Sequence, residues 1–477
     1  MNLSNRDVRQ FTANRNLLII MVIVGVLASA WFLGQRASIL WLGLLVVGIG
    51  ATLVLKQPLI GLLALVVIAL VGPIKINTGT TVQINPTTLV IPALLVLWVL
   101  VMILQKDVRL VPSAVNKPLI AFVIAGLISL LVGSVLWNPL VPRSGNFLLV
   151  QMAQWAIFAF SAGAFLLTAN LVKDELWLQR LTFAFLVVSG GLAILSLIPV
   201  TRSLVYDIST IAFIRAPFWM LIAALAGGQL LFNGKLSAGW RIFLIVSLLA
   251  VVNYAFFLSR DSASTWGGVG TAFAVLIWFR FPRVRWLLVL FVLALAATGA
   301  LFPALWDFAG GDTEWKTTGG SRIALIERVM QVSMFNPVTG LGPAAYRKYA
   351  AMEPLKYGNA FWVAPQVNSH NNFVDLFSHV GIVGLVLFAW FVWEMSKIGG
   401  KLRSCYLEGF SAGYVNGTLA AGVGALVLMM FADWILPFVY NIGFHGFQAS
   451  VLVWLFLGGL VALEQMMPAP EACPPGA

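Results

Sequence analysis

Apolar residues run along this chain in blocks long enough to cross a membrane, separated by short polar segments. About 20 helical residues span the hydrocarbon core, so a block of eighteen or more apolar residues is a candidate transmembrane helix. The pattern predicts spans at 17–33, 38–55, 58–72, 87–105, 118–136, 147–171, 176–199, 210–232, 240–258, 263–281, 285–303, 373–393, 411–431 and 447–463. We therefore expect about 12–14 transmembrane helices, of which the short 58–72 and the Gly/Ala-rich 411–431 have the weakest signals.

Composition points to the same fold class. Of the 477 residues, 60% are hydrophobic and 10% charged, and the mean hydropathy is +0.95. Soluble domains are about 45–50% apolar and about 25% charged. The chain is therefore predicted to be an all-α polytopic membrane protein. Its net charge of +12 is better explained by basic cytoplasmic loops than by nucleic-acid binding.

Basic residues predict the orientation of the spans. With the N-terminus placed inside, 17 of the 29 Lys and Arg residues fall in inside loops, and six lie in the longest polar segment. Positive residues concentrate in cytoplasmic loops, so this placement agrees with the rule. The remaining six, in short outside loops, are Arg36, Lys75, Arg143, Arg202, Arg215 and Arg260.

The longest polar segment, 307–370, is thus expected on the extracytoplasmic side. Loops held by a rigid scaffold often carry function, so we expect the chemistry here. We divide the chain into an N-terminal transmembrane bundle (1–306), an extracytoplasmic catalytic loop (307–370), C-terminal transmembrane helices (371–465) and a cytoplasmic tail (466–477).

One helix is predicted within this loop, over 322–335, with Ser321 as its N-cap and positions 323, 326, 330 and 333 as its apolar face. Arg322 would lie in the first turn, where a cation opposes the helix dipole by roughly 0.3–1 kcal/mol. It is either a solvated arginine that tolerates this cost or part of an anion site with the free N–H groups of the helix start.

Three histidines occur in the chain, of which His370 and His445 are predicted on the outside and His379 on the helix that follows His370. His370 lies just before a predicted helix start, which disfavours the imidazolium and keeps the ring neutral and able to accept a proton. His379 is four residues after Asp375, so a structural contact between them is expected. His445 is a weaker candidate. The three are too dispersed for a metal site.

Two arginines outside this loop are further candidates. Arg260 interrupts apolar sequence, either as a membrane-surface anchor or as a functional cation, and Asp261 is its possible pair. Arg215 falls inside the predicted span 210–232, and an intramembrane arginine is a functional candidate.

At these residues the sequence resembles a known family. His370-Asn371, nine further residues and Gly381-Ile-Val-Gly384 resemble the H-N-x9-G-x-x-G signature of the O-antigen ligase superfamily, which includes O-antigen polymerases and protein O-oligosaccharyltransferases. The segment from Arg322 through Asn336-Pro337-x-x-Gly340-x-Gly342 to Tyr346 resembles its upstream loop motif, and Ser259-Arg260 its arginine after a mid-chain span. One departure is Ile326, where that motif often has Leu. The matching motifs cover 258–395.

The resemblance implies a metal-independent inverting glycosyltransferase of the bacterial cytoplasmic (inner) membrane, with its active site facing the periplasm. It would need no cofactor, and its partners would be an undecaprenyl-diphosphate-linked glycan, a glycan or lipid A-core acceptor, and the bilayer. His370 would act as the base and Arg260 and Arg322 would stabilise the leaving diphosphate. Substrate-binding candidates are Arg215, Asn371, Tyr346 and Trp362, although Trp362 also suits interfacial anchoring.

Two alternatives to ligase activity remain. The nearer is an O-antigen or exopolysaccharide polymerase of the same superfamily. The other is a polysaccharide or lipid transporter, in which the arginines guide an anionic cargo. The chain contains no matching pair of Gly/Pro-broken spans and few charges within its spans, which favours an enzyme.

Overall fold

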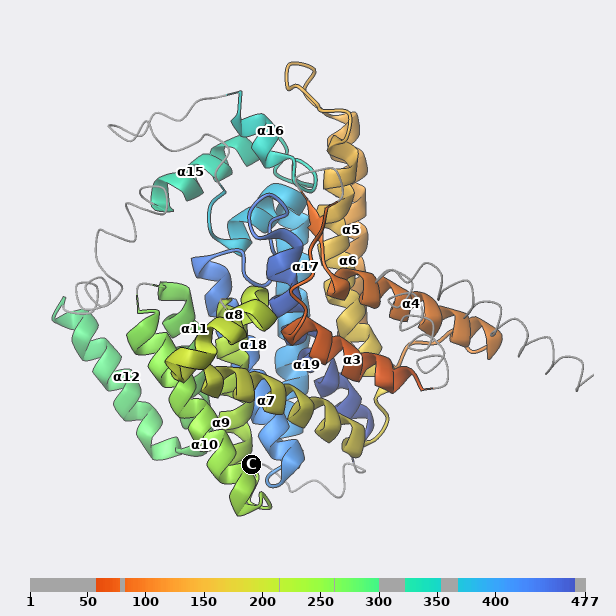
Figure 1. The fold of residues 1–477 in the computed structure, drawn as a ribbon. Helices are drawn as coiled ribbons and strands as arrows, with labels where there is room; N and C mark the ends of the chain where they lie inside the picture. Colours follow the sequence, from red (N-terminus) through yellow and green to blue (C-terminus); the bar gives the residue numbers. More distant parts are fainter. Residues whose placement is uncertain are drawn as a thin grey trace, which may run out of the picture. The chain divides into compact units, whose positions relative to one another are not determined.

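The computed structural model describes residues 57–77, 82–213, 215–260, 262–299, 322–352 and 368–467. The chain divides into two units, Met1–Ile60 and Gly61–Ala477, and the features below belong to the second. Its helices, drawn in Figure 1, are α3 (Pro58–Leu70), α4 (Pro86–Leu104), α5 (Asn116–Val135), α6 (Phe147–Leu171), α7 (Glu175–Leu197), α8 (Pro199–Phe213), α9 (Ala216–Phe232), α10 (Ala238–Asn253), the π-helix η1 (Tyr254–Leu258), α11 (Ala263–Arg280), α12 (Pro282–Ala297), α15 (Arg322–Ser333), α16 (Tyr346–Ala350), α17 (Asn372–Cys405), α18 (Phe410–Phe431) and α19 (Gly443–Gln465). In the described part, two strands of two residues each, β1 (Ile76–Asn77) and β2 (Gln83–Ile84), pair in antiparallel orientation and form a small sheet.

The predicted all-α membrane class is confirmed. Eight of the described helices are long and apolar enough to cross a membrane, and the shorter α3 and α9 are apolar as well. The span predicted at 147–171 coincides with α6, and most others agree within a few residues. The first two predicted spans lie outside the described residues, and the division into four segments stays a prediction.

The span predicted at 210–232 was drawn too long. Two helices occupy this region, and Arg215 stands between them with an extended backbone as the N-cap of α9. Pro217 explains the boundary, because proline suits the first turn of a helix and not its interior. Arg215 therefore lies at a helix start rather than within a span.

The span predicted at 373–393 was drawn too short. Helix α17 continues to Cys405, so Lys397, Lys401 and Arg403 lie in its last turns rather than in a loop. Near its start the helix is broken at Gly381, whose φ of 67° is not helical.

Small residues allow the long helices to approach closely, as expected for membrane bundles. Helix α19, almost fully buried, packs on α6, and α18 packs on α9 and α11. A Cβ on Gly458 of α19 would lie 2.2 Å from the carbonyl oxygen of Phe165 in α6. The absence of a side chain at Gly458 therefore allows α19 to pack closely on α6.

The helix predicted in the polar loop exists as α15, but its buried face only partly matches the predicted one, of which Ser333 is buried as expected. Leu325 and Val329 are fully buried and Val332 nearly so, whereas Met330 is exposed. The face actually used is set by packing against α16 and α17. Its Val329 and Val332 join a hydrophobic cluster with residues of α16 and of the α5–α6 connection, namely Trp137, Val141, Phe147, Leu341, Ala345, Tyr346, Tyr349 and Ala350. The predicted N-cap Ser321 lies outside the described residues.

Candidate active site

The turn after α15 is inserted into the break in α17. The amides of Ile382 and Val383, which follow the break, donate to the carbonyls of Pro337 (2.9 Å) and Val338 (3.3 Å). In return, the amide of Leu341 donates to the carbonyl of Ser378 at 2.9 Å. These bonds attach the polar loop to α17 at Ser378, Ile382 and Val383, about two to four helical turns after His370.

This docking requires glycine on both sides. Gly340 and Gly381 both have positive φ, 78° and 67°. A Cβ on Gly381 would lie 2.2 Å from the oxygen of Val338, and one on Gly340 would lie 2.6 Å from the amide of Val380. The glycines singled out in the two motifs therefore meet each other, backbone against backbone.

His370 is held in an unusual backbone conformation immediately before α17. Its φ is 51°, in the left-handed region that non-glycine residues rarely adopt and that recurs at active sites. Asn371, next along the chain, caps α17 by accepting from the amides of Phe373 (3.0 Å) and Val374 (3.2 Å). On the other side, Ser369 donates its hydroxyl to the buried Asp375 at 2.8 Å. His370 is thus fixed between two anchored neighbours while remaining partly exposed.

Asn372 ties this segment to the connection between α18 and α19. Its side chain accepts from the amides of Ile435 (3.0 Å) and Leu436 (3.1 Å) and donates to the carbonyl of Leu436 at 2.8 Å. Gln154 of α6 holds the same connection, donating to the carbonyl of Pro437 and accepting from the amide of Val439. Side chains of α17 and α6 therefore hold the connection 433–439 in position.

This arrangement brings Asp433 within electrostatic range of His370, an interaction that the sequence analysis missed. Asp433 is buried, accepts from the amide of Phe438 (2.8 Å) and the side chain of Asn441 (2.7 Å), and interacts electrostatically with His370. Burial raises the pKa of Asp433, and the hydrogen bond from Phe438 and the nearby His370 offset part of that shift. The two residues are far apart in sequence, so no local pattern reveals the contact.

The three predicted arginines are placed at helix ends. Arg322 is the first residue of α15, and Arg260, which is exposed, follows η1 and precedes α11. The start of α11 contacts the end of α18 between Gly267 and Phe431, and Asn371 donates to the carbonyl of Met430 at 3.2 Å. Arg260 and His370 therefore belong to the same end of the bundle. Arg215 interacts electrostatically with Asp433.

Tyr346 and Asn371 take structural positions, and Trp362 lies outside the described residues. Tyr346 is 2% exposed within the hydrophobic cluster, and Asn371 caps α17. Their roles in substrate binding stay predictions.

His379 has a partner other than the predicted one, and His445 bonds a residue of β2. His379 accepts from the amide of Ala344 at 3.3 Å, and Asp375 binds Ser369 and Asn368, so the expected Asp375–His379 contact is wrong. The break at Gly381 and the docked turn redirect His379 toward the loop. His445 Nε2 bonds Gln83 Oε1 at 2.7 Å.

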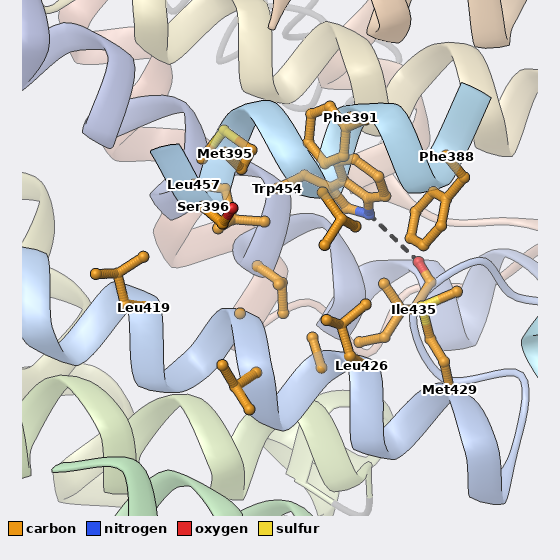
Figure 2. Close-up of a pocket in the computed structure, with 15 residues that line it drawn as sticks. Phe388, Phe391, Met395, Ser396, Leu419, Leu426, Met429, Ile435, Trp454 and Leu457 are labelled. Carbon is orange, nitrogen blue, oxygen red and sulfur yellow. Dashed lines mark hydrogen bonds between the residues drawn. The ribbon is translucent and has the colours of Figure 1, made fainter. Parts of the chain in front are cut away.

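An apolar cavity of about 110 Å³ lies between α17, α18 and α19. Figure 2 shows Phe388, Phe391 and Met395 on one side and Leu426 and Met429 on another. Ile435 lines one end, and its carbonyl accepts from Trp454 Nε1 at 3.3 Å. The cavity therefore reaches the connection that carries Asp433.

Among the described residues, no group of three or more His, Cys, Asp or Glu side chains has the arrangement of a metal site. What the site does contain is a histidine beside a buried carboxylate, with arginines at the same end of the bundle. Such a set is capable of accepting a proton and stabilising negative charge.

The fold and site define a multi-pass α-helical membrane protein with a polar loop docked at one end of its bundle. Residues 245–389 match the family model described as O-antigen ligase. A relative from Rickettsia conorii, named "Putative polysaccharide ligase", is 22% identical over an alignment of 223 residues that covers 42% of this chain. This chain covers 52% of that relative. Both matches support the O-antigen ligase superfamily, as the resemblance carried by the motifs predicts.

Proposed function

We propose that the protein transfers a glycan from an undecaprenyl-diphosphate carrier to an acceptor hydroxyl, as an O-antigen ligase does with lipid A-core. The observation that carries this proposal is His370, held in a left-handed conformation beside the buried Asp433. The superfamily match supports a ligase-type enzyme acting on glycans. The donor, the acceptor and the inverting course are part of the proposal.

In the proposed reaction the acceptor oxygen attacks the anomeric carbon on the face opposite the diphosphate. His370 removes the acceptor proton as the new C–O bond forms, and the bond between the anomeric carbon and the phosphate oxygen breaks. Its electron pair leaves with the diphosphate, so the anomeric centre is inverted. The carboxylate of Asp433 stabilises the positive charge that the His370 imidazole gains when it accepts this proton.

The departing diphosphate needs positive charge, and we assign this role to Arg260 and Arg322. Arginine suits phosphate because its planar guanidinium presents two parallel donors. Arg322 stands at the start of α15, where the free N–H groups of a helix add to an anion site. No metal enters this scheme.

A lipid-linked donor also needs a place for its chain. The apolar cavity of α17–α19 lies within apolar helices and ends at Ile435, two residues from Asp433. A chain lying there would leave its diphosphate at the end of the bundle where His370 stands. At about 110 Å³ the cavity holds only a short part of such a chain, and we assign it to the part nearest the diphosphate.

The side of the membrane follows from charge. His370, Arg260 and Arg215 lie at one end of the bundle, and at the other end Arg403 of α17 bonds Asn416 at 2.9 Å. Because the basic residues are concentrated at this second end, we place it in the cytoplasm and His370 in the periplasm, at the inner membrane.

The test of this function is His370→Asn in the full-length protein, assayed with an undecaprenyl-diphosphate glycan and a lipid A-core acceptor. Asparagine tolerates the left-handed conformation, so the fold should survive while the base is lost. A base of this kind contributes about 10²–10⁴ in rate, and transfer should fall by that factor while carrier binding persists. Wild-type rates in this variant would contradict the assignment.

A control and a second variant sharpen the result. His379→Asn removes another histidine of α17 that contacts the loop and not Asp433, and any loss of activity there should follow loss of folded protein. Asp433→Asn should lower the rate without weakening carrier binding. An Asp433→Asn protein that transfers glycan normally would remove the carboxylate from the mechanism.

A further inference from the structure

A second polar cluster includes Arg215, which interacts electrostatically with Asp433. Trp434 follows Asp433, and the guanidinium carbon of Arg215 lies 5.5 Å from the centre of its ring. His445, near the start of α19, interacts electrostatically with Arg215 and with Lys75, which precedes β1. Four separate parts of the chain thus meet at one place.

Three nitrogen atoms in this cluster are buried and have no hydrogen-bond partner in the described protein. They are Nε of Arg215, Nε1 of Trp434 and Nδ1 of His445. A buried donor or acceptor left without a partner costs about 1–3 kcal/mol, and more if it is charged. Three such atoms within one cluster are better explained by a ligand than by three separate defects.

The donors and acceptors define the ligand that would fit. Gln83 donates its amide to Asn77, so its oxygen accepts from His445 Nε2, and the neutral ring presents Nδ1 as an acceptor. Arg215 and Trp434 present N–H donors. A ligand that complements these atoms has an oxyanion, which accepts from Arg215 and Trp434, beside a hydroxyl group, which donates to His445 Nδ1.

The charge of the cluster agrees with an anion. Lys75 and Arg215 are both cations, and both oxygens of the nearest acid, Asp433, are already bonded to Phe438 and Asn441. Burial lowers the pKa of Arg215, as expected for a desolvated cation that Asp433 compensates only in part. A bound oxyanion would complete that compensation.

We propose that Arg215, Trp434, His445 and Lys75 form a subsite for an acidic sugar, one that carries a carboxylate or phosphate next to a free hydroxyl. The subsite adjoins the reacting centre through Asp433. Its role in selecting an acidic glycan rests on the proposed transfer reaction, whereas the binding itself is measured without any transfer. The function assigned to Arg260 and Arg322 concerns the diphosphate and is separate.

The experiment is saturation-transfer NMR of full-length protein in detergent with the monosaccharides glucuronate, glucose 6-phosphate and glucose. It uses the Arg260→Gln/Arg322→Gln double variant, so that the proposed diphosphate site does not contribute. At least one acidic sugar should give signal, and glucose should give much less. Comparing the two acidic sugars identifies which oxyanion the subsite prefers.

Two substitutions locate the binding. Arg215→Gln removes the buried cation, and Trp434→Phe removes only the indole N–H while keeping a ring. A hydrogen bond to a charged group is worth about 1.5–3 kcal/mol, so affinity should fall about 10- to 100-fold in each variant. Arg202→Gln, whose Nε bonds the carbonyl of Ser196, is the matched control and should bind as before.

The proposal is overturned if glucose binds as well as both acidic sugars, if no acidic sugar binds, or if Arg215→Gln and Trp434→Phe bind unchanged. A protein that binds glucuronate through Arg215 but transfers no glycan would refute the proposed reaction and leave the subsite standing. The acidic-sugar subsite is therefore tested by sugar binding, and the proposed reaction is tested separately by glycan transfer.

Discussion

Replacing Asn372 by alanine should loosen the connection that carries Asp433. The side chain is 1% exposed and makes three hydrogen bonds to the backbone of Ile435 and Leu436. Each bond contributes about 1 kcal/mol net, which gives about 3 kcal/mol of local stability. Since every 1.4 kcal/mol is a factor of ten, opening of this segment should become roughly 100-fold more frequent.

Amide hydrogen exchange measures this opening directly, because the amides of Ile435 and Leu436 are the two donors that lose their acceptor. Peptides covering 433–438 should exchange roughly 100-fold faster in the variant, while peptides from α6 should not change. Asn371→Ala is the matched control, since its bonds go to Phe373, Val374 and Met430. Unchanged exchange at 435–436 in the Asn372→Ala protein would refute this reasoning.

Two more predictions concern glycines. Gly381→Ala should lower the free energy of unfolding by more than about 1 kcal/mol and reduce transfer, because the φ of Gly381 is positive and the new Cβ would lie 2.2 Å from the Val338 oxygen. Gly400→Ala, in open space on the same helix, is the control and should be tolerated. Equal thermal stability of the two variants would contradict the docking argument. Gly422→Leu should fill the apolar cavity and raise the KM for a long-chain donor more than for a short-chain one. Gly191→Leu, outside the cavity, is its control. If Gly422→Leu raised the KM equally for both donors, the cavity would be excluded as the site of the chain.

The helices could be predicted from the sequence because burial in lipid demands long apolar runs. The α6 boundaries, and most others, follow from that requirement alone. The boundary between α8 and α9 could not be drawn from hydropathy, since apolar residues continue on both sides of Arg215. The face of α15 was also missed, because its neighbours α16 and α17, rather than its own periodicity, decide which side is buried.

The site could be predicted only where its residues are close in sequence. His370, Asn371 and the glycines of the motif stand out locally, as does Arg322 at the start of a helix. Asp433 becomes part of the site only through Asn372 and Gln154, which position a connection far along the chain. Contacts of this kind depend on how helices pack, and a single sequence carries no local signal for them.

The break in α17 also constrains how the protein is assembled. At Ile382 and Val383, two amides find their acceptors in the turn at 337–338 instead of within the helix. An amide without an acceptor is costly near a bilayer, where water cannot replace it. The outer part of α17 therefore cannot settle until the preceding polar loop has docked. We therefore expect insertion of the spans and completion of the helix to be separate events, with the helix completed when the loop docks.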